Sequence, residues 1–126
     1  MSTVAIIGAG DIGAACARSL AARDRFSRIV LVDDVAAAGK ALDIQQSGSI
    51  EGFHTRLGGT ADLTQAINAD VCVIADRMGA PCREWTGEDG LAFIRQLAPL
   101  ASRAALVFAG PRAPELMRQA VVELGI

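Results

Sequence analysis

Three glycines and one carboxylate near the N-terminus carry the clearest chemistry in this sequence. Gly8, Gly10 and Gly13 have the spacing G-x-G-x-x-G and follow an apolar run, Val4-Ala5-Ile6-Ile7. A second apolar run ends at Asp33, which lies about 20 residues after the last glycine, the spacing typical of a ribose-binding acid. A strand, a glycine turn, a helix and a second strand in this order predict a dinucleotide site.

Each part of the glycine motif meets a physical demand of such a ligand. Gly8 allows a tight turn out of the strand, Gly10 lets the backbone approach a pyrophosphate, and Gly13 lets the helix pack closely on the sheet. The first helical residues, Asp11 and Ile12, are expected to present free amides to the phosphates, whose negative charge the helix dipole favours.

Asp33 points to the identity of the cofactor. Its carboxylate would accept the hydroxyls of the adenosine ribose and repel a 2′-phosphate, and Asp34 adds negative charge beside it. We therefore expect NAD(H) rather than NADP(H). The alternative is that the glycines serve only a tight strand-to-helix turn. Against it, the sequence offers no packing reason for the bare Gly10 and no folding reason for an acid at the end of a buried strand.

The elements that must position these residues alternate between strands and helices, which predicts β-α-β units and a parallel sheet. We expect an α/β fold with a doubly wound, Rossmann-type parallel sheet of about five strands, the first strand at its centre, and helices on both faces. The predicted strands are residues 3–8, 28–33, 53–57, 70–75 and 104–109. The predicted helices are residues 11–24, 36–46 and 88–101, a short turn from Asp62, and a last helix from Pro114.

Two of these helices carry specific predictions. Ile12, Cys16 and Leu20 are expected to share one face of the first helix. In the last helix, the expected inward stripe is Leu116, Met117, Ala120, Val121 and Leu124. Residues 1–126 should form one dinucleotide-binding domain, truncated before a sixth strand, with no second, catalytic domain in this chain.

Composition narrows the function classes. The 126 residues are 52% hydrophobic and only 21% charged, with a net charge of −2. Without a basic cluster, nucleic acid and anionic membranes are poor partners, and we expect no membrane span and no metal site. Cys16 and Cys72 fall in apolar patterns and are expected to be buried reduced thiols of a cytoplasmic protein, while Cys82 lies in a loop.

Several stretches resemble one family, the malate/lactate dehydrogenases, in their N-terminal NAD-binding domain. Gly39-Lys40-Ala41-Leu42-Asp43-Ile44 is similar to the family segment G-K-A-L-D-L. Gly58-Gly59-Thr60-Ala61-Asp62 looks like its G-T-x-D turn, and Ala69-Asp70-Val71-Cys72-Val73-Ile74 like its A-D-V-V-V-I strand. The resemblance implies an oxidoreductase that, as a full enzyme, transfers hydride between NAD and a 2-hydroxy acid.

The sequence departs from the family where substrate chemistry is expected. The family has T-A-G after its fourth strand, but this chain has Ala75-Asp76-Arg77. There we expect a local ion pair between Asp76 and Arg77, and repulsion between Asp76 and a pyrophosphate. The family's substrate loop carries two arginines, whereas here Arg83 is the one nearby arginine after Pro81.

The remaining departures concern catalysis. The family motif S-N-P after the fifth strand reads Ala109-Gly110-Pro111 and loses the amide. The family's catalytic His-Asp pair belongs to the second half of the enzyme. His54 is the single histidine, and we expect it to be structural or solvent-facing. We therefore predict no catalytic residue in this chain.

Two side chains of the substrate loop have alternative interpretations. Arg83 would hold the carboxylate of a small 2-hydroxy or 2-oxo acid in a bidentate contact, or would be a solvated arginine paired with Glu84 or Glu88. Trp85 would close over a ligand as part of a lid, or pack under the loop as an anchor, which is the favoured role.

Two functions remain open at this point. The first is the NAD-binding domain of a malate/lactate dehydrogenase-like enzyme, and the alternative is a divergent, non-catalytic NAD-binding or interaction module. The apolar composition and an uncovered fifth-strand edge also predict a homo-oligomer.

Overall fold

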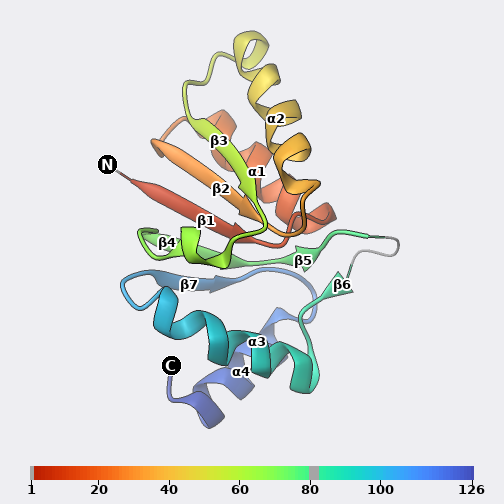
Figure 1. Cartoon of the computed structure of the whole chain (residues 1–126), viewed down its shortest axis with the longest axis vertical. Coiled ribbons are helices and arrows are strands. Elements are labelled where there is room, and N and C mark those ends of the chain that lie inside the picture. The colour runs from red at the N-terminus through yellow and green to blue at the C-terminus, as the bar shows by residue number, and fades with distance from the viewer. Residues whose placement is uncertain (1, 80–82) are drawn as a thin grey trace.

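The computed structural model describes residues 2–79 and 83–126, apart from the side chain of residue 49. Cys82 therefore lies outside the described residues. Five parallel strands form one sheet in the order β3-β2-β1-β4-β7, with β1 at the centre as predicted (Figure 1). Their bounds are β1 Thr3–Ile7, β2 Arg28–Val32, β3 Arg56–Thr60, β4 Val71–Ile74 and β7 Ala105–Phe108.

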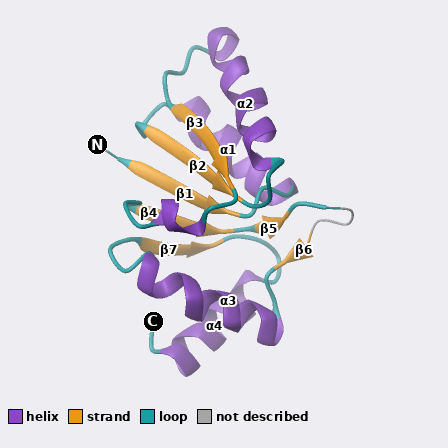
Figure 2. Ribbon diagram, in the orientation of Figure 1, coloured by secondary structure: helices purple, strands orange, loops and turns teal. Residues whose placement is uncertain are grey.

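Within the described residues, three α-helices and one 3-10 turn connect these strands, and a fourth helix follows β7. Figure 2 shows the helices gathered around the strand array, with α2 beside β3 and with α3 and α4 beside β7. Their bounds are α1 Asp11–Arg23, α2 Ala37–Glu51, α3 Gly87–Leu100, α4 Ala113–Leu124 and the 3-10 turn η1 Leu63–Ala66. Asp62 caps η1 through its carboxylate, which accepts the amide of Thr64, as expected from its position.

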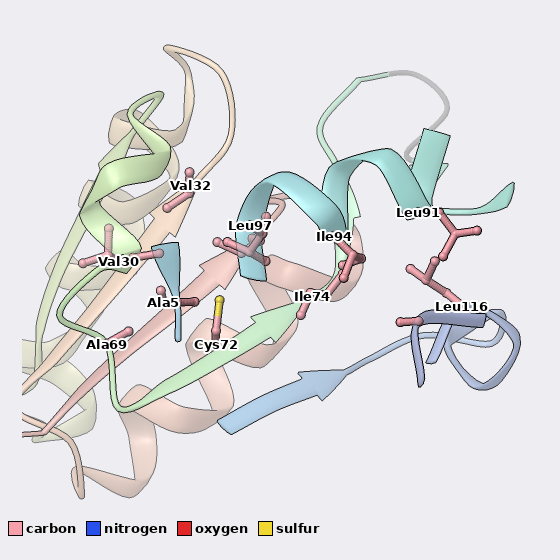
Figure 3. Close-up of a cluster of buried hydrophobic side chains, with 14 residues drawn as sticks. Ala5, Val30, Val32, Ala69, Cys72, Ile74, Leu91, Ile94, Leu97 and Leu116 are labelled. Atoms are coloured by element: carbon pink, nitrogen blue, oxygen red, sulfur yellow. The ribbon is translucent and has the colours of Figure 1, made fainter. Parts of the chain in front are cut away.

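The sheet divides the interior into two apolar clusters, one on each face. Val4, Ile6 and Leu31 point toward α1 and α2, while Ala5, Ile7 and Val30 point toward α3 and α4. Because both faces are covered, β1 and β2 are buried almost without interruption, as expected of a parallel sheet. In Figure 3, Ile94 and Leu97 of α3 lie over the sheet residues Cys72 and Ile74, and Leu91 lies near Leu116 of α4.

Helix α1 packs on the sheet mainly through small residues. Gly13, Ala14, Ala17 and Ala21 are its buried positions, whereas Ile12, Cys16 and Leu20 are only partly buried against the same cluster. The predicted face exists, but the small residues lie deeper because they let the helix axis approach the strands closely.

The third strand begins later than predicted. It pairs with β2 from Arg56 opposite Arg28, and residues 53–55 precede it. Phe53 is 5% exposed and fills the core, while the amides of His54 and Thr55 both donate to the Asp24 carboxylate. These contacts keep residues 53–55 out of the hydrogen-bond ladder of the sheet. The strand therefore includes Gly58 and Gly59, which the sequence predicted to lie in a turn.

Helix α2 is longer than the predicted 36–46. Gln45 connects it to the third strand, because its side-chain amide donates to the Thr55 carbonyl and its side-chain oxygen accepts the Leu57 amide. Gly48 packs against the Phe53 ring. These tertiary contacts extend the helix through a weak local sequence to Gly52, whose positive φ ends it.

The last helix buries only part of its predicted stripe. Leu116 and Ala120 are buried, but Met117 and Val121 are 47% and 53% exposed. Both line a groove of about 470 Å³ beside β7, the edge strand of the sheet.

One element was not predicted. The strands β5 Asp76–Arg77 and β6 Arg83–Glu84 form an antiparallel ribbon, which places the two ends of the substrate loop side by side. Among the described residues, none of the helices is long and apolar enough to cross a membrane.

Candidate functional site

The glycine turn folds as the sequence predicts and meets the fourth-strand segment. Gly8 follows β1 with φ +104, and a Cβ there would collide with the backbone of Asp76. A Cβ on Gly13 would collide with the carbonyl of Gly8. Both glycines are therefore required by the packing of the chain itself.

Asp33 lies at the carboxyl end of the sheet and connects three loop segments. Its Oδ2 accepts the amides of Ala9 and Met78, each at 2.8 Å, and its Oδ1 accepts the amide of Asp34 at 2.8 Å. A carboxylate offers about four lone-pair positions, so these contacts leave about one, on Oδ1, for a ligand hydroxyl. Asp33 thus has a folding role that the sequence did not reveal, beside its predicted binding role.

The side chain of Asp76 lies at the N-terminus of α1. Its Oδ2 accepts the amide of Ile12 at 3.1 Å, and its Oδ1 accepts the amide of Gly13 at 2.9 Å. Its backbone carbonyl accepts the amide of Gly10 at 2.9 Å, and the residue is 3% exposed. The amides predicted to face phosphates therefore have a partner within the chain.

This placement corrects two predictions. The carboxylate of Asp76 is bound by backbone amides, and the Arg77 guanidinium lies 4.4 Å from the centre of the Trp85 ring, so the expected ion pair between Asp76 and Arg77 is wrong. A Cβ on Gly10 would lie 2.6 Å from the Asp76 carboxyl carbon. Gly10 therefore does have a packing reason to lack a side chain.

The charge of Asp76 also acts on a neighbouring thiol. Burial and then the negative charge of Asp76 raise the pKa of Cys16. Burial raises the pKa of Cys72 to about 12. Both thiols are free and protonated at neutral pH, and Cys72 is buried as predicted, whereas Cys16 is only partly buried.

Trp85 is packed between two other side chains. Its ring stacks on Phe93, with 3.8 Å between ring centroids and 11° between planes, and its other contact is the Arg77 guanidinium. This is the predicted anchoring role. The buried atoms Trp85 Nε1 and Arg77 Nε have no hydrogen-bond partner among the described residues.

An apolar cavity of about 300 Å³ opens beside this stack at the carboxyl ends of the strands. Asp33 lies at its edge, and Trp85 and Phe93 form an aromatic wall. Its remaining lining residues are Ile7, Val32, Asp34, Ala61, Leu63, Arg77 and Gln96. We call it the apolar cavity. Switch-point crevices of this kind are where open α/β sheets bind ligands.

A second, charged cavity of about 690 Å³ lies on the other side of Arg77. It brings together three acids, Asp11, Asp76 and Glu84, and three arginines, Arg77, Arg83 and Arg112. The structure thus places the predicted Arg83 in a site with Asp11, Ile12 and Asp76, although Arg83 itself is exposed.

Sequence reasoning missed Arg112 and the role of Glu84. The Glu84 carboxylate accepts the backbone amide of Arg112 at 2.9 Å, which joins the ribbon to the start of α4. The position of Arg112 in the sequence could have identified it, because this residue follows the carboxyl end of β7, where ligands bind.

His54 lies away from both cavities. It precedes β3, its side chain is exposed, and its backbone amide donates to Asp24 Oδ1 at 2.7 Å. The structure confirms the predicted structural or solvent-facing position.

Residues 2–88 match the family model of the lactate/malate dehydrogenase NAD binding domain. Relatives include the malate dehydrogenase of Salinibacter ruber, 44% identical over 73 residues, which are 56% of this chain and 23% of that protein. The malate dehydrogenase of Roseiflexus castenholzii is 34% identical over 114 residues, which are 89% of this chain and 35% of that protein.

Solved structures show the same fold. The Salinibacter ruber malate dehydrogenase superposes with a TM-score of 0.72 at 30% identity, covering 94% of this chain and 40% of that one. The Cryptosporidium parvum lactate dehydrogenase complexed with lactic acid and nicotinamide adenine dinucleotide gives a TM-score of 0.78 at 20% identity, covering 99% and 42%. This chain therefore spans less than half of each relative and belongs to the lactate/malate dehydrogenase family, matching its NAD-binding domain.

Proposed function

We propose that residues 1–126 act as one cofactor-binding domain of an NAD-dependent dehydrogenase for small 2-hydroxy acids. The observation that carries this proposal is the position of Asp33, which ends β2 at the edge of the apolar cavity with an acceptor position left for a ribose hydroxyl. In this proposal Asp33 binds the cofactor ribose, and the predicted residues Gly8, Gly10, Asp11, Ile12 and Gly13 form the turn beside the cofactor. Arg83, in the charged cavity, would hold the substrate carboxylate.

The test is a calorimetric titration of the chain with NADH and NADPH. We expect NADH to bind more tightly by about tenfold or more, because the carboxylates of Asp33 and Asp34 repel a 2′-phosphate. Asp34→Ala should reduce the difference in affinity between NADH and NADPH. Equal or tighter binding of NADPH to the wild-type chain would contradict the proposed cofactor choice.

Ala61→Leu is a second variant that leaves the hydrogen bonds of Asp33 intact. Ala61 lines the apolar cavity, and the added methyl groups would fill it. We expect weaker NADH binding with an unchanged melting temperature. Ala92→Leu, an exposed position in α3 that is absent from the cavity lining, is the matched control.

A non-catalytic NAD-binding or interaction module is the second candidate. It is favoured by the replacement of the family's asparagine, which helps to position the substrate and the nicotinamide, with Gly110. We expect no malate or lactate turnover by the isolated chain, followed by reduced-nicotinamide absorbance. Turnover that disappears in Arg83→Ala would reject the module.

We also propose a cytoplasmic location and self-association. The free thiols of Cys16 and Cys72 suit a reducing compartment. The groove beside β7 exposes Met117 and Val121, and an uncovered edge strand recruits partners. Sedimentation velocity should show a mass that rises with concentration. A monomer at high concentration would reject the self-association.

A further inference from the structure

At the glycine turn, the backbone amides that would bind phosphates already donate to another residue of the chain. The amides of Ile12 and Gly13 donate to the Asp76 carboxylate, and the amide of Gly10 donates to the Asp76 carbonyl. The space beside Gly10, which lacks a side chain, is occupied by the same carboxylate. A pyrophosphate would need these donors and this space.

Asp76 is also negatively charged and would repel a phosphate placed beside it. The residue is 3% exposed, so water screens its charge poorly and a second anion beside it would be repelled. The nearest guanidinium in sequence, that of Arg77, is stacked on Trp85 and donates to the Glu84 carbonyl at 3.4 Å. It is therefore already engaged away from the Asp76 carboxylate.

The apolar cavity, by contrast, is open. Its lining includes Asp33 but neither Asp76 nor the first residues of α1. Its volume of about 300 Å³ lies at the lower end of the range for small-molecule sites, which suits a base and its ribose better than a whole dinucleotide.

The lining of this cavity suits a purine nucleoside. Trp85 and Phe93 are its aromatic members, and a base would pack against its apolar surface. Trp85 Nε1 and Arg77 Nε have no partner among the described residues, but these two atoms are themselves buried. Asp33 Oδ1 keeps about one lone pair for a ribose hydroxyl.

We propose that Asp76 acts as an internal substitute for the cofactor phosphates and makes this site selective for the purine nucleoside part of its ligand. The inference rests on the proposed function for the location of the ligand. It adds that adenosine binds in the apolar cavity and that phosphates attached to it contribute no affinity.

The test compares adenosine, ADP-ribose and NAD on the wild-type chain and on Asp76→Asn and Asp76→Ala by calorimetry. For the wild type we expect adenosine to bind at least as tightly as the two phosphorylated ligands. In both variants, ADP-ribose and NAD should gain about tenfold or more, which corresponds to about 1.4 kcal/mol, while adenosine stays unchanged. Asp24→Asn is the matched control, because Asp24 also accepts two backbone amides, those of His54 and Thr55, outside both cavities.

Backbone amide NMR of the wild-type chain gives a readout that does not depend on the variants folding. Adenosine should shift the signals of residues around the apolar cavity, and NAD should leave the amides of Ile12 and Gly13 unshifted. Strong NAD shifts at these two amides would overturn the inference.

The failures of the two proposals are distinguishable. Wild-type binding of NAD about tenfold more tightly than adenosine, unchanged in Asp76→Asn, would overturn the phosphate substitute and leave the NAD-binding function standing. Absence of binding by all three ligands to the wild-type and variant chains would overturn both.

Discussion

The glycine turn and the apolar cavity lie at the same end of the sheet but differ in how their polar groups are satisfied. At the glycine turn, the amides of Gly10, Ile12 and Gly13 all donate to Asp76. In the apolar cavity, Asp33 accepts three amides and keeps about one acceptor position on Oδ1 beside open space. The cavity can therefore still bind a ligand hydroxyl, whereas the donors of the turn are already used.

This difference shows that a glycine motif reports backbone geometry before it reports a ligand. A strand, a tight turn and a closely packed helix require Gly8 and Gly13 here whether or not phosphate binds. Whether the turn remains free to bind depends on residue 76, which lies on another strand connection. The motif therefore predicts the fold more firmly than the ligand.

Gly10→Ala should give the largest effect, because it breaks the fit between the turn and Asp76. The new Cβ would lie 2.6 Å from the Asp76 carboxyl carbon, and we expect a loss of about 1–3 kcal/mol in the free energy of unfolding. The measurement is urea denaturation. Gly39→Ala in α2 is the control, since a Cβ there meets nothing within 4 Å and should stabilise by about 0.5–1 kcal/mol.

The same substitution in the Asp76→Ala background separates a specific clash from general strain. Without the carboxylate, Gly10→Ala should cost less than in the wild type, and the two changes should be non-additive by about 1 kcal/mol or more. Additive costs would show that Asp76 does not determine the need for glycine at position 10.

The sequence predicted the fold well where the signals are local. The pattern around β1, α1 and β2 gave their bounds to within a residue, because apolar periodicity, the glycine spacing and the terminal acid all act over short distances. The third strand was misplaced because its start depends on Asp24 anchoring His54 and Thr55, a contact across about thirty residues that no local pattern encodes.

The sequence indicated the end of the sheet at which the candidate site lies but not the hydrogen bonds of its side chains. Asp33, at the end of a parallel strand, lines the apolar cavity, and Arg83 lines the charged cavity. Asp76 was predicted to pair with Arg77 and to repel a pyrophosphate, and its binding to the helix N-terminus was missed. Its hydrogen bonds to Ile12 and Gly13 depend on how closely the β4 end approaches the helix, which sequence spacing does not specify.

Trp85→Phe tests the apolar cavity, and we expect its effect to be smaller than that of Gly10→Ala. The substitution keeps an aromatic ring against Phe93 and Arg77 but removes the unpaired Nε1 donor. We expect the free energy of unfolding to change by less than about 1 kcal/mol, because the buried Nε1 has no hydrogen bond to lose among the described residues. Adenosine affinity should fall about twofold, because the smaller ring offers less apolar contact to the ligand. Urea denaturation and calorimetry measure the two quantities. An unchanged affinity would show that the indole ring of Trp85 does not contact the ligand.

Asp24 lies at the opposite end of the sheet, outside both cavities. We expect its substitution to have the smallest effect on stability. Hydrogen bonds, foremost that from the His54 backbone amide, lower the pKa of Asp24 from its ordinary value of 3.8. A carboxylate whose pKa is lower in the folded state stabilises the fold above the unfolded value, and this contribution is lost as the pH falls through the folded pKa. Asp24→Asn should therefore lower Tm slightly at pH 7, and the difference from wild type should shrink below about pH 4. Asp62 and Glu115, whose pKa values are also lowered, titrate in both proteins and cancel in this difference. A Tm difference that stays constant down to pH 2 would mean that the ionised carboxylate of Asp24 contributes nothing to stability.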